Sequence, residues 1–182
     1  MYRYLWKLCL YIIIMVPVYM LVRRPWKRKK EREWALGGFW LFMAALMALA
    51  LEGEYGSPAR MAADAAERIA AGNRISLVPF RTIGSFFQHF IFDIFMVNIV
   101  GNIVMFMPWG FGLPLLWKRR QSVGSVLMCS LALPLCIESS QLFIGRSVDI
   151  DDLILNFVGG CLGAGVYFAI RKCFPEIGRL AR

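Results

Sequence analysis

Residues 146–163 read RSVDIDDLILNFVGGCLG, in which a polar opening with one arginine and three aspartates runs directly into an apolar segment with three glycines. Asp149, Asp152 and Asn156 are spaced by three and four residues, so they share one side of a helix, while Asp151 falls off that stripe. Two of the glycines, four residues apart, continue nearly the same stripe and allow another helix to approach closely. An ionised side chain at the centre of a membrane helix costs roughly 2.5–3.5 kcal/mol, so this stripe is the first place to look for function.

The composition around this stretch is that of a membrane protein. The chain has 182 residues, of which 59% are hydrophobic and 18% charged, and its mean hydropathy of +0.57 is too high for an ordinary soluble domain. Five runs approach the ~20 apolar residues that cross a bilayer. We therefore predict an all-α polytopic helix bundle that forms one membrane domain over residues 1–182, with five spans at Tyr4–Val22, Trp34–Leu51, Ile91–Trp109 with a continuation toward Trp117, Ser122–Gln141 and Asp149–Ile170.

The net charge of +9 is unevenly distributed along the chain. Lys and Arg concentrate in residues 23–32, in 118–120 and in the tail 171–182, and with five spans these clusters fall on one side of the membrane. The positive-inside rule then places the N-terminus outside and the C-terminus in the cytoplasm. Topology and contact with anionic lipid explain the basic clusters, so we expect membrane lipids as partners and no nucleic acid.

The largest outer segment, residues 52–90, is expected to be an extracellular loop that contains a short helix. Ser57 is a typical N-cap before a proline, and Gly72 is a typical residue just beyond a helix end, so the pattern predicts a helix over Pro58–Ala71. Its apolar stripe either docks on the bundle or rests on lipid headgroups; the stripe comprises Met61, Ala62, Ala65, Ala66 and Ile69.

Two other predicted spans carry polar groups near their outer ends. Asn98 and Asn102 are four residues apart in the third span, and Glu138 and Gln141 are three apart in the fourth. In the third span, Gly101 would permit close helix approach, and two prolines predict a kink or break toward the cytoplasmic end. With the loop residue Arg146, these groups fall in the outer half of the bilayer or at its surface. We infer one polar pocket open to the outside, built from Asn98, Asn102, Glu138, Gln141, Arg146, Asp149, Asp152 and Asn156.

The cysteine and histidine content points away from metal and cofactor sites. The five cysteines lie in or beside predicted spans and no Cys-x-x-Cys occurs, which supports neither a disulfide framework nor a zinc site. His89, the only histidine, is expected to make a headgroup or hydrogen-bond contact. We predict no cofactor and no bound metal.

The same residues carry a family resemblance. The motifs are Leu77-x-Pro79-Phe80, the block from Asn98 to Gly110, the Glu138-x-x-Gln141 pair, and the block from Arg146 to Gly159. In this order they resemble the VanZ-like family of bacterial membrane proteins, named for low-level resistance to the glycopeptide antibiotic teicoplanin; the resemblance covers residues 76–165. Ser76 departs from the pattern, which often has Asn there. We expect structural roles for Pro79, Phe80, Gly101, Pro108, Gly110, Gly159 and Gly163.

The resemblance implies a multi-pass protein of a bacterial cytoplasmic membrane. It supplies a phenotype, low-level teicoplanin resistance, rather than a defined reaction. The leading hypothesis is a binding protein whose outer pocket holds an envelope lipid, a cell-wall precursor, a teichoic-acid element or the glycopeptide itself. The second is an enzyme that modifies a lipid-linked envelope component with Glu138, Asp149 and Asp152 as paired carboxylates or as oxygen ligands of Mg²⁺ or Ca²⁺. A third makes the polar groups a purely structural network in which Arg146 pairs with Asp149 or Asp152. The Gly159-x-x-x-Gly163 face also suits a homo-oligomer.

Overall fold

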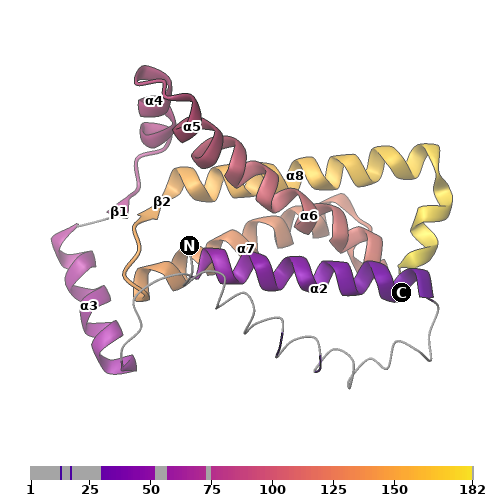
Figure 1. The fold of residues 1–182 in the computed structure, drawn as a ribbon, viewed down its shortest axis with the longest axis horizontal. Helices are drawn as coiled ribbons and strands as arrows, with labels where there is room; N and C mark the ends of the chain where they lie inside the picture. Colours follow the sequence, from indigo (N-terminus) through magenta and orange to yellow (C-terminus); the bar gives the residue numbers. More distant parts are fainter. Residues whose placement is uncertain (1–12, 14–16, 18–29, 52–56, 73–74, 182) are drawn as a thin grey trace.

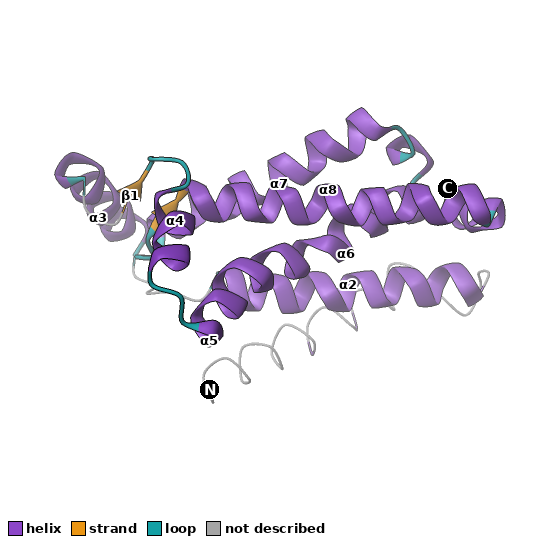
Figure 2. Cartoon of the chain, turned by 90° about the horizontal axis from the view of Figure 1, so that it is seen from above, coloured by secondary structure: helices purple, strands orange, loops and turns teal. Residues whose placement is uncertain are grey.

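The computed structural model describes residues 13, 17, 30–51, 57–72 and 75–181. Within them, four long helical segments run alongside one another (Figures 1 and 2), each long and apolar enough to cross a membrane. The predicted all-α membrane bundle is therefore confirmed, and so are four of its five spans; Tyr4–Val22 lies outside the described residues. The segments are α2 (Lys30–Ala50), the composite helix α5–η2–α6 (Phe92–Phe95, Met96–Val100, Gly101–Leu116), α7 (Val123–Phe143) and α8 (Ile150–Cys173).

The composite helix departs from the sequence-based expectation. It continues through Pro108 and Pro114 to Leu116, so neither proline ends it. Its irregular part is the π-helical turn η2, which lies in the opposite half of the span. A proline inside a membrane helix is tolerated where neighbouring helices and local adjustments satisfy the freed carbonyl, and here α2, α7 and α8 all pack against α6.

The closest packing joins α6 to α8. A Cβ placed on Gly159 would collide with the carbonyl oxygen of Ile103, and one on Gly163 would collide with that of Met107. On the facing helix, a Cβ on Gly110 would collide with the carbonyl of Gly160. The two backbones therefore touch along about two turns of α6. At Gly101 an added Cβ would meet only the Met96 oxygen of its own helix at 3.5 Å, so this glycine serves no close helix approach.

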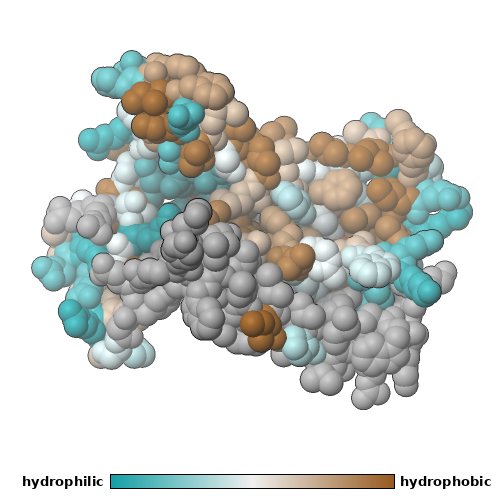
Figure 3. Space-filling model, viewed as in Figure 1, coloured by the Kyte–Doolittle hydropathy of each residue, from teal (hydrophilic) through white to brown (hydrophobic). Residues whose placement is uncertain are grey.

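Apolar side chains fill the space between the helices and also cover the flanks that face outward. Leu46, Phe106 and Ile137 join α2, α6 and α7 in one buried cluster. In the space-filling view, apolar residues cover the visible flank of α6 and α8, and hydrophilic residues gather toward the ends of the bundle (Figure 3). This distribution is that of a bundle surrounded by hydrocarbon.

The segment between the second and third spans packs over one end of the bundle (Figure 1). The predicted helix Pro58–Ala71 is confirmed as α3, with Ser57 Oγ accepting from the Arg60 N–H and Gly72 at φ 62°. A short parallel ladder follows, in which β1 (Ile75–Ser76) pairs with β2 (Val148–Asp149), and then comes α4 (Arg81–Gln88). The ladder was not predicted, because two residues per strand leave no periodicity to read.

Only part of the predicted α3 stripe docks on the bundle. Ala65 is buried and Met61 half-buried, whereas Ile69 stays 58% exposed. Arg68, a polar residue, makes the main link, donating through Nη1 to the Leu142 carbonyl at 2.9 Å. The face of α3 that contacts the bundle is therefore rotated away from its apolar stripe. It includes Arg68, whose guanidinium reaches the Leu142 carbonyl in the last turn of α7, where carbonyls lack intrahelical partners.

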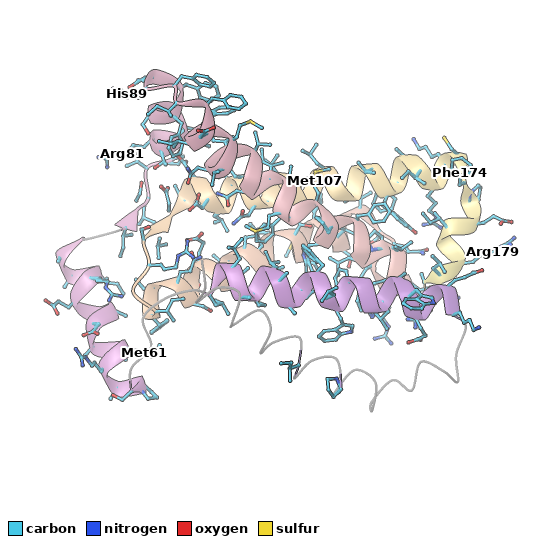
Figure 4. The ribbon with its side chains drawn as sticks, in the orientation of Figure 1. Met61, Arg81, His89, Met107, Phe174 and Arg179 are labelled. Atoms are coloured by element: carbon cyan, nitrogen blue, oxygen red, sulfur yellow. The ribbon has the colours of Figure 1, made fainter. Side chains whose placement is uncertain are left out.

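The opposite end of the bundle is basic. It contains the start of α2, the end of α8 and two short 3-10 segments, η3 (Lys118–Arg120) and η4 (Pro175–Leu180). Figure 4 labels Arg179 at this end, far from Arg81 at the start of α4 and from His89 just after its end. The predicted gathering of the basic clusters at one side of the bundle is thus confirmed for the described residues, which are Lys30, Arg32, Lys118, Arg119, Arg120, Arg171, Lys172 and Arg179.

Candidate functional site

The site begins with a polar link between α6 and α8. Asn102 donates through Nδ2 to Asp152 Oδ1 at 2.9 Å and also to the Asn98 carbonyl at 2.8 Å. Both side chains are half-buried. Because Asp152 lies in the first turn of α8, its carboxylate also faces the positive end of that helix dipole.

The helix opposite Asp152 is irregular where it contributes to the site. Residues 96–100 form the π-helical turn η2, and Asn98 lies within it. Single π-helical turns inside α-helices are frequently found at functional sites. The Asn98 amide bonds to the Ile94 carbonyl of its own helix at 2.8 Å, so Asn98 contributes its backbone oxygen to Asn102 rather than its side chain.

Glu138 brings a third helix, α7, to the same place. Its side chain is buried, with only 5% of the residue exposed, and Oε2 accepts from the Asp149 N–H at 3.4 Å. The Glu138 carboxylate lies close enough to Asp149, Asp152 and Arg146 to interact with their charges. Three carboxylates from two helices therefore share one partly dehydrated region.

Two polar oxygens beside these carboxylates are buried without a hydrogen-bond partner in the described part of the chain. One is Oδ1 of Asn156, one turn further along α8 from Asp152, in a residue that is 5% exposed. The other is Oγ of Ser76, whose residue pairs with Asp149 in the β1–β2 ladder. Leaving a buried polar group unpaired costs about 1–3 kcal/mol, so each such group needs an explanation. We name the set Asn102, Glu138, Asp149, Asp152 and Asn156 the outer polar cluster.

Gln141 and Arg146 contact a different target, the C-terminal end of α2. Gln141 is buried and donates to the Ala50 carbonyl at 2.9 Å, and Arg146 Nη1 donates to the Leu49 and Ala50 carbonyls at 3.3 and 3.5 Å. A cation is favourable at a helix C-terminus, where carbonyls lack intrahelical partners. The expected ion pair of Arg146 with Asp149 or Asp152 is absent within residues 30–51, 57–72 and 75–181, so that part of the structural-network hypothesis is wrong there.

Asp151 is the residue that the sequence interpretation passed over. It is fully buried, and its carboxylate accepts from the backbone N–H groups of Phe80, Thr82 and Ile83 at 2.5, 2.8 and 3.0 Å. These are orphan donors at the start of α4, where Phe80 adopts a left-handed φ of 63° and supplies no side-chain cap of its own. Phe80, which precedes the first residue of α4, has no side chain that can cap the helix. This lack of a local cap was the available signal that a carboxylate from a distant part of the chain supplies it.

Asp149 connects this cap to the cluster. Its Oδ2 accepts from the Thr82 hydroxyl at 2.5 Å, and its Oδ1 accepts from the Asp151 N–H at 3.0 Å as the N-cap of α8. The Leu77-x-Pro79-Phe80 segment is therefore fixed over the cluster by Asp149 and Asp151 together.

The arrangement of acidic groups is not that of a metal site. Among the described residues, no three His, Cys, Asp or Glu side chains come together in a way that could hold a metal ion. Ser139 and Ser140 donate to carbonyls of their own helix, at 2.7 Å each, and His89 is exposed at the end of α4. The site thus offers an excess of hydrogen-bond acceptors with negative charge, which suits a partner rich in N–H or O–H donors.

Comparison with known proteins gives one match. A protein-family model described as VanZ/LLP1 matches residues 39–171, which include every member of the outer polar cluster. No curated protein and no solved structure matches the chain.

Proposed function

The chain belongs to the VanZ/LLP1 family, and from that premise we propose that it is a membrane protein whose outer polar cluster binds a cell-envelope lipid, a cell-wall precursor or a glycopeptide and so lowers susceptibility to teicoplanin. The observation that carries the proposal is the unpaired and buried Asn156 Oδ1, one helical turn along α8 from the half-buried Asp152. Asn156 Oδ1 and the carboxylates of Asp152 and Glu138 can accept hydrogen bonds, and no described cation lies within ion-pair distance of either carboxylate. Sugar hydroxyls and amino groups are donors that fit them.

The proposed orientation follows from the basic end of the bundle. By the positive-inside rule this end faces the cytoplasm of a bacterial cell, and the outer polar cluster then faces outward. The Asp149 and Asp151 contacts to α4 place the cluster beside the Leu77–Phe80 segment, whose side chains are largely exposed. A ligand in the outer leaflet could reach the cluster from that side.

A purely structural role explains fewer of the contacts. Asp151, Gln141 and Arg146 each bind backbone groups and account for the joining of α8, α4 and α2. Glu138 and Asp152 each accept a hydrogen bond but are not needed for those joints. Asn156 Oδ1 accepts none, and a network built only for packing would pair that buried oxygen. The contact of the Thr82 hydroxyl with Asp149 Oδ2 belongs to the joint between α4 and α8, so we favour binding over catalysis.

The test replaces the charge in the cluster without changing side-chain size. Glu138→Gln and Asp152→Asn are expressed in a teicoplanin-sensitive bacterial host, with Asp93→Asn as the matched control, because Asp93 is an exposed carboxylate at the same end of the bundle. We expect the two cluster variants to lose protection at unchanged membrane abundance, and the control to keep it. Full protection by both cluster variants, or none by the unmodified protein, would overturn the proposal.

A further inference from the structure

A second polar site lies at the basic end of the bundle, remote from the outer polar cluster. A pocket of about 980 Å³ opens there between the start of α2, the η3 turn, the end of α8 and η4. Its charged lining consists of four cationic and two anionic side chains, which are Arg32, Lys118, Arg171, Arg179, Glu31 and Glu176. The pocket is thus cationic overall, in contrast to the acceptor-rich cluster at the other end.

Some of these charged side chains contact neighbouring elements of the protein and are not available to a ligand. Arg32 is buried and donates through Nε to the Leu180 carbonyl at 3.0 Å and through Nη2 to the Leu116 carbonyl at 3.4 Å. It joins the start of α2 to the ends of α6 and η4. Arg179 and Glu176 form an exposed ion pair at 3.0 Å and largely neutralise one another.

Two further cationic residues line the pocket, Lys118 from η3 and Arg171 from the end of α8. Lys118 is exposed, and no hydrogen bond or ion pair holds its ammonium group anywhere in the part of the chain that the structure describes. Arg171 is half-buried beside the Tyr167 hydroxyl and Gly178. Only Glu31 remains to balance them, so an anion entering the pocket meets a net positive charge.

A polar bridge holds the inner side of the pocket in place. Gln121 Nε2 lies within hydrogen-bond distance of the Tyr167 hydroxyl at 3.3 Å, the Pro114 carbonyl at 3.3 Å and the Gly178 carbonyl at 3.4 Å. These contacts tie η4 to α6 and α8 and so fix the position of Arg171 relative to η3. The cationic pair is therefore presented by a braced fold rather than by a free tail.

The rest of the lining is apolar and comes mainly from η4, including Pro175, Ile177 and Leu180. Two large apolar side chains near this end are exposed, Trp34 at 81% and Phe174 at 67%, as is usual for residues at a membrane interface. A pocket that has two cationic side chains and an apolar wall and lies near the membrane interface suits an amphiphile with an anionic head group. We propose that it binds the phosphate group of an anionic phospholipid, with Lys118 and Arg171 as the contacting residues.

The test compares two double variants with the same loss of charge on the same elements. The pocket variant is Lys118→Ala with Arg171→Ala; the control is Arg119→Ala with Lys172→Ala, whose residues do not line the pocket. The full chain is purified in detergent, and retention of phosphatidylglycerol against phosphatidylcholine is measured by native mass spectrometry. We expect about tenfold weaker retention of phosphatidylglycerol for the pocket variant and a small change for the control.

Equal losses in the two double variants would assign the effect to diffuse surface charge and overturn the proposal. The single variant Lys118→Ala guards against a folding defect, because no described contact depends on its ammonium group; unchanged retention in this variant would also count against the site. A final arm titrates inorganic phosphate alone. If it binds with the same variant dependence and phosphatidylglycerol does not, the pocket belongs to a soluble phosphate compound and the lipid assignment is wrong.

Discussion

The carboxylate of Asp151, in the first turn of α8, accepts a hydrogen bond of 2.8 Å from the backbone N–H of Thr82, at the start of α4. The residues are 69 positions apart in the chain, yet this contact supplies the cap that α4 lacks in its own sequence. It also positions the Pro79–Phe80 turn over the outer polar cluster. The acidic opening of α8 therefore has two tasks, one in holding the outer segment and one in forming the cluster.

Removing this cap should loosen the outer segment without dissolving the bundle. We expect Asp151→Ala to destabilise the fold by about 2–4 kcal/mol, because three backbone donors lose a charged acceptor, and Asp151→Asn to cost less. Thermal unfolding in detergent measures the loss, and limited proteolysis should show faster cleavage between α3 and α5. Asp93→Ala is the control; a melting temperature for Asp151→Ala equal to that of the control would contradict the prediction.

The link between α6 and α8 can be measured directly. A double-mutant cycle on Asn102→Ala and Asp152→Ala should give a coupling energy of about 0.6–1.7 kcal/mol, the range known for hydrogen bonds between membrane helices. Reversible unfolding in mixed micelles provides the four free energies. Strict additivity of the two substitutions would show that the 2.9 Å contact contributes nothing to stability.

Close packing of α6 on α8 should make two glycines intolerant of a methyl group. Gly159→Ala and Gly163→Ala each force a Cβ into a backbone carbonyl of α6, so we expect a loss of about 1–3 kcal/mol from overpacking. Gly165→Ala, in the same helix, is the matched control, since nothing lies within 4 Å of its added Cβ. Comparable melting temperatures for all three variants would refute the close approach.

The link to α2 depends on Gln141. Gln141→Leu removes the shorter of two hydrogen bonds to the Ala50 carbonyl and leaves that oxygen only the 3.5 Å contact with Arg146 Nη1, which should cost about 1–3 kcal/mol. Ser140→Ala is the control, because its hydroxyl bonds only within its own helix and the residue is exposed. Thermal stability in detergent checks the difference, and an equal stability of the two variants would rule out a structural role for the amide.

A substitution of Asn156 distinguishes a role in ligand binding from a role in stability. Because its Oδ1 is buried and unpaired, Asn156→Leu should leave stability unchanged or raise it slightly, while teicoplanin protection is lost. Unfolding midpoints and growth in teicoplanin are compared with those of the unmodified protein. A variant that is strongly destabilised would mean that Asn156 serves packing instead, and one that retains full protection would remove it from the proposed site.

The sequence predicted the elements well where a long local pattern existed. Apolar runs of about 20 residues located four described spans, and Ser57 with Gly72 bounded α3, because local composition and capping chemistry govern these features. The polar stripe of Asp149, Asp152 and Asn156 was also legible, since helical spacing alone puts those residues on one face. The partners of Arg146 and Gln141 were not, because they are carbonyls at the end of α2 that no sequence pattern marks.

The order of apolar and polar residues thus determined an all-α membrane bundle, the accumulation of basic residues at one end, and the presence of costly polar groups at the other. Tertiary structure alone decided how those groups are used. It assigned Asp151 to α4, Arg146 to α2 and Asn102 to Asp152, and it left Asn156 Oδ1 without a partner. The physical reason is that hydrogen-bond partners are fixed by the spatial approach of helices, which depends on glycine packing between α6 and α8 rather than on the spacing within either helix.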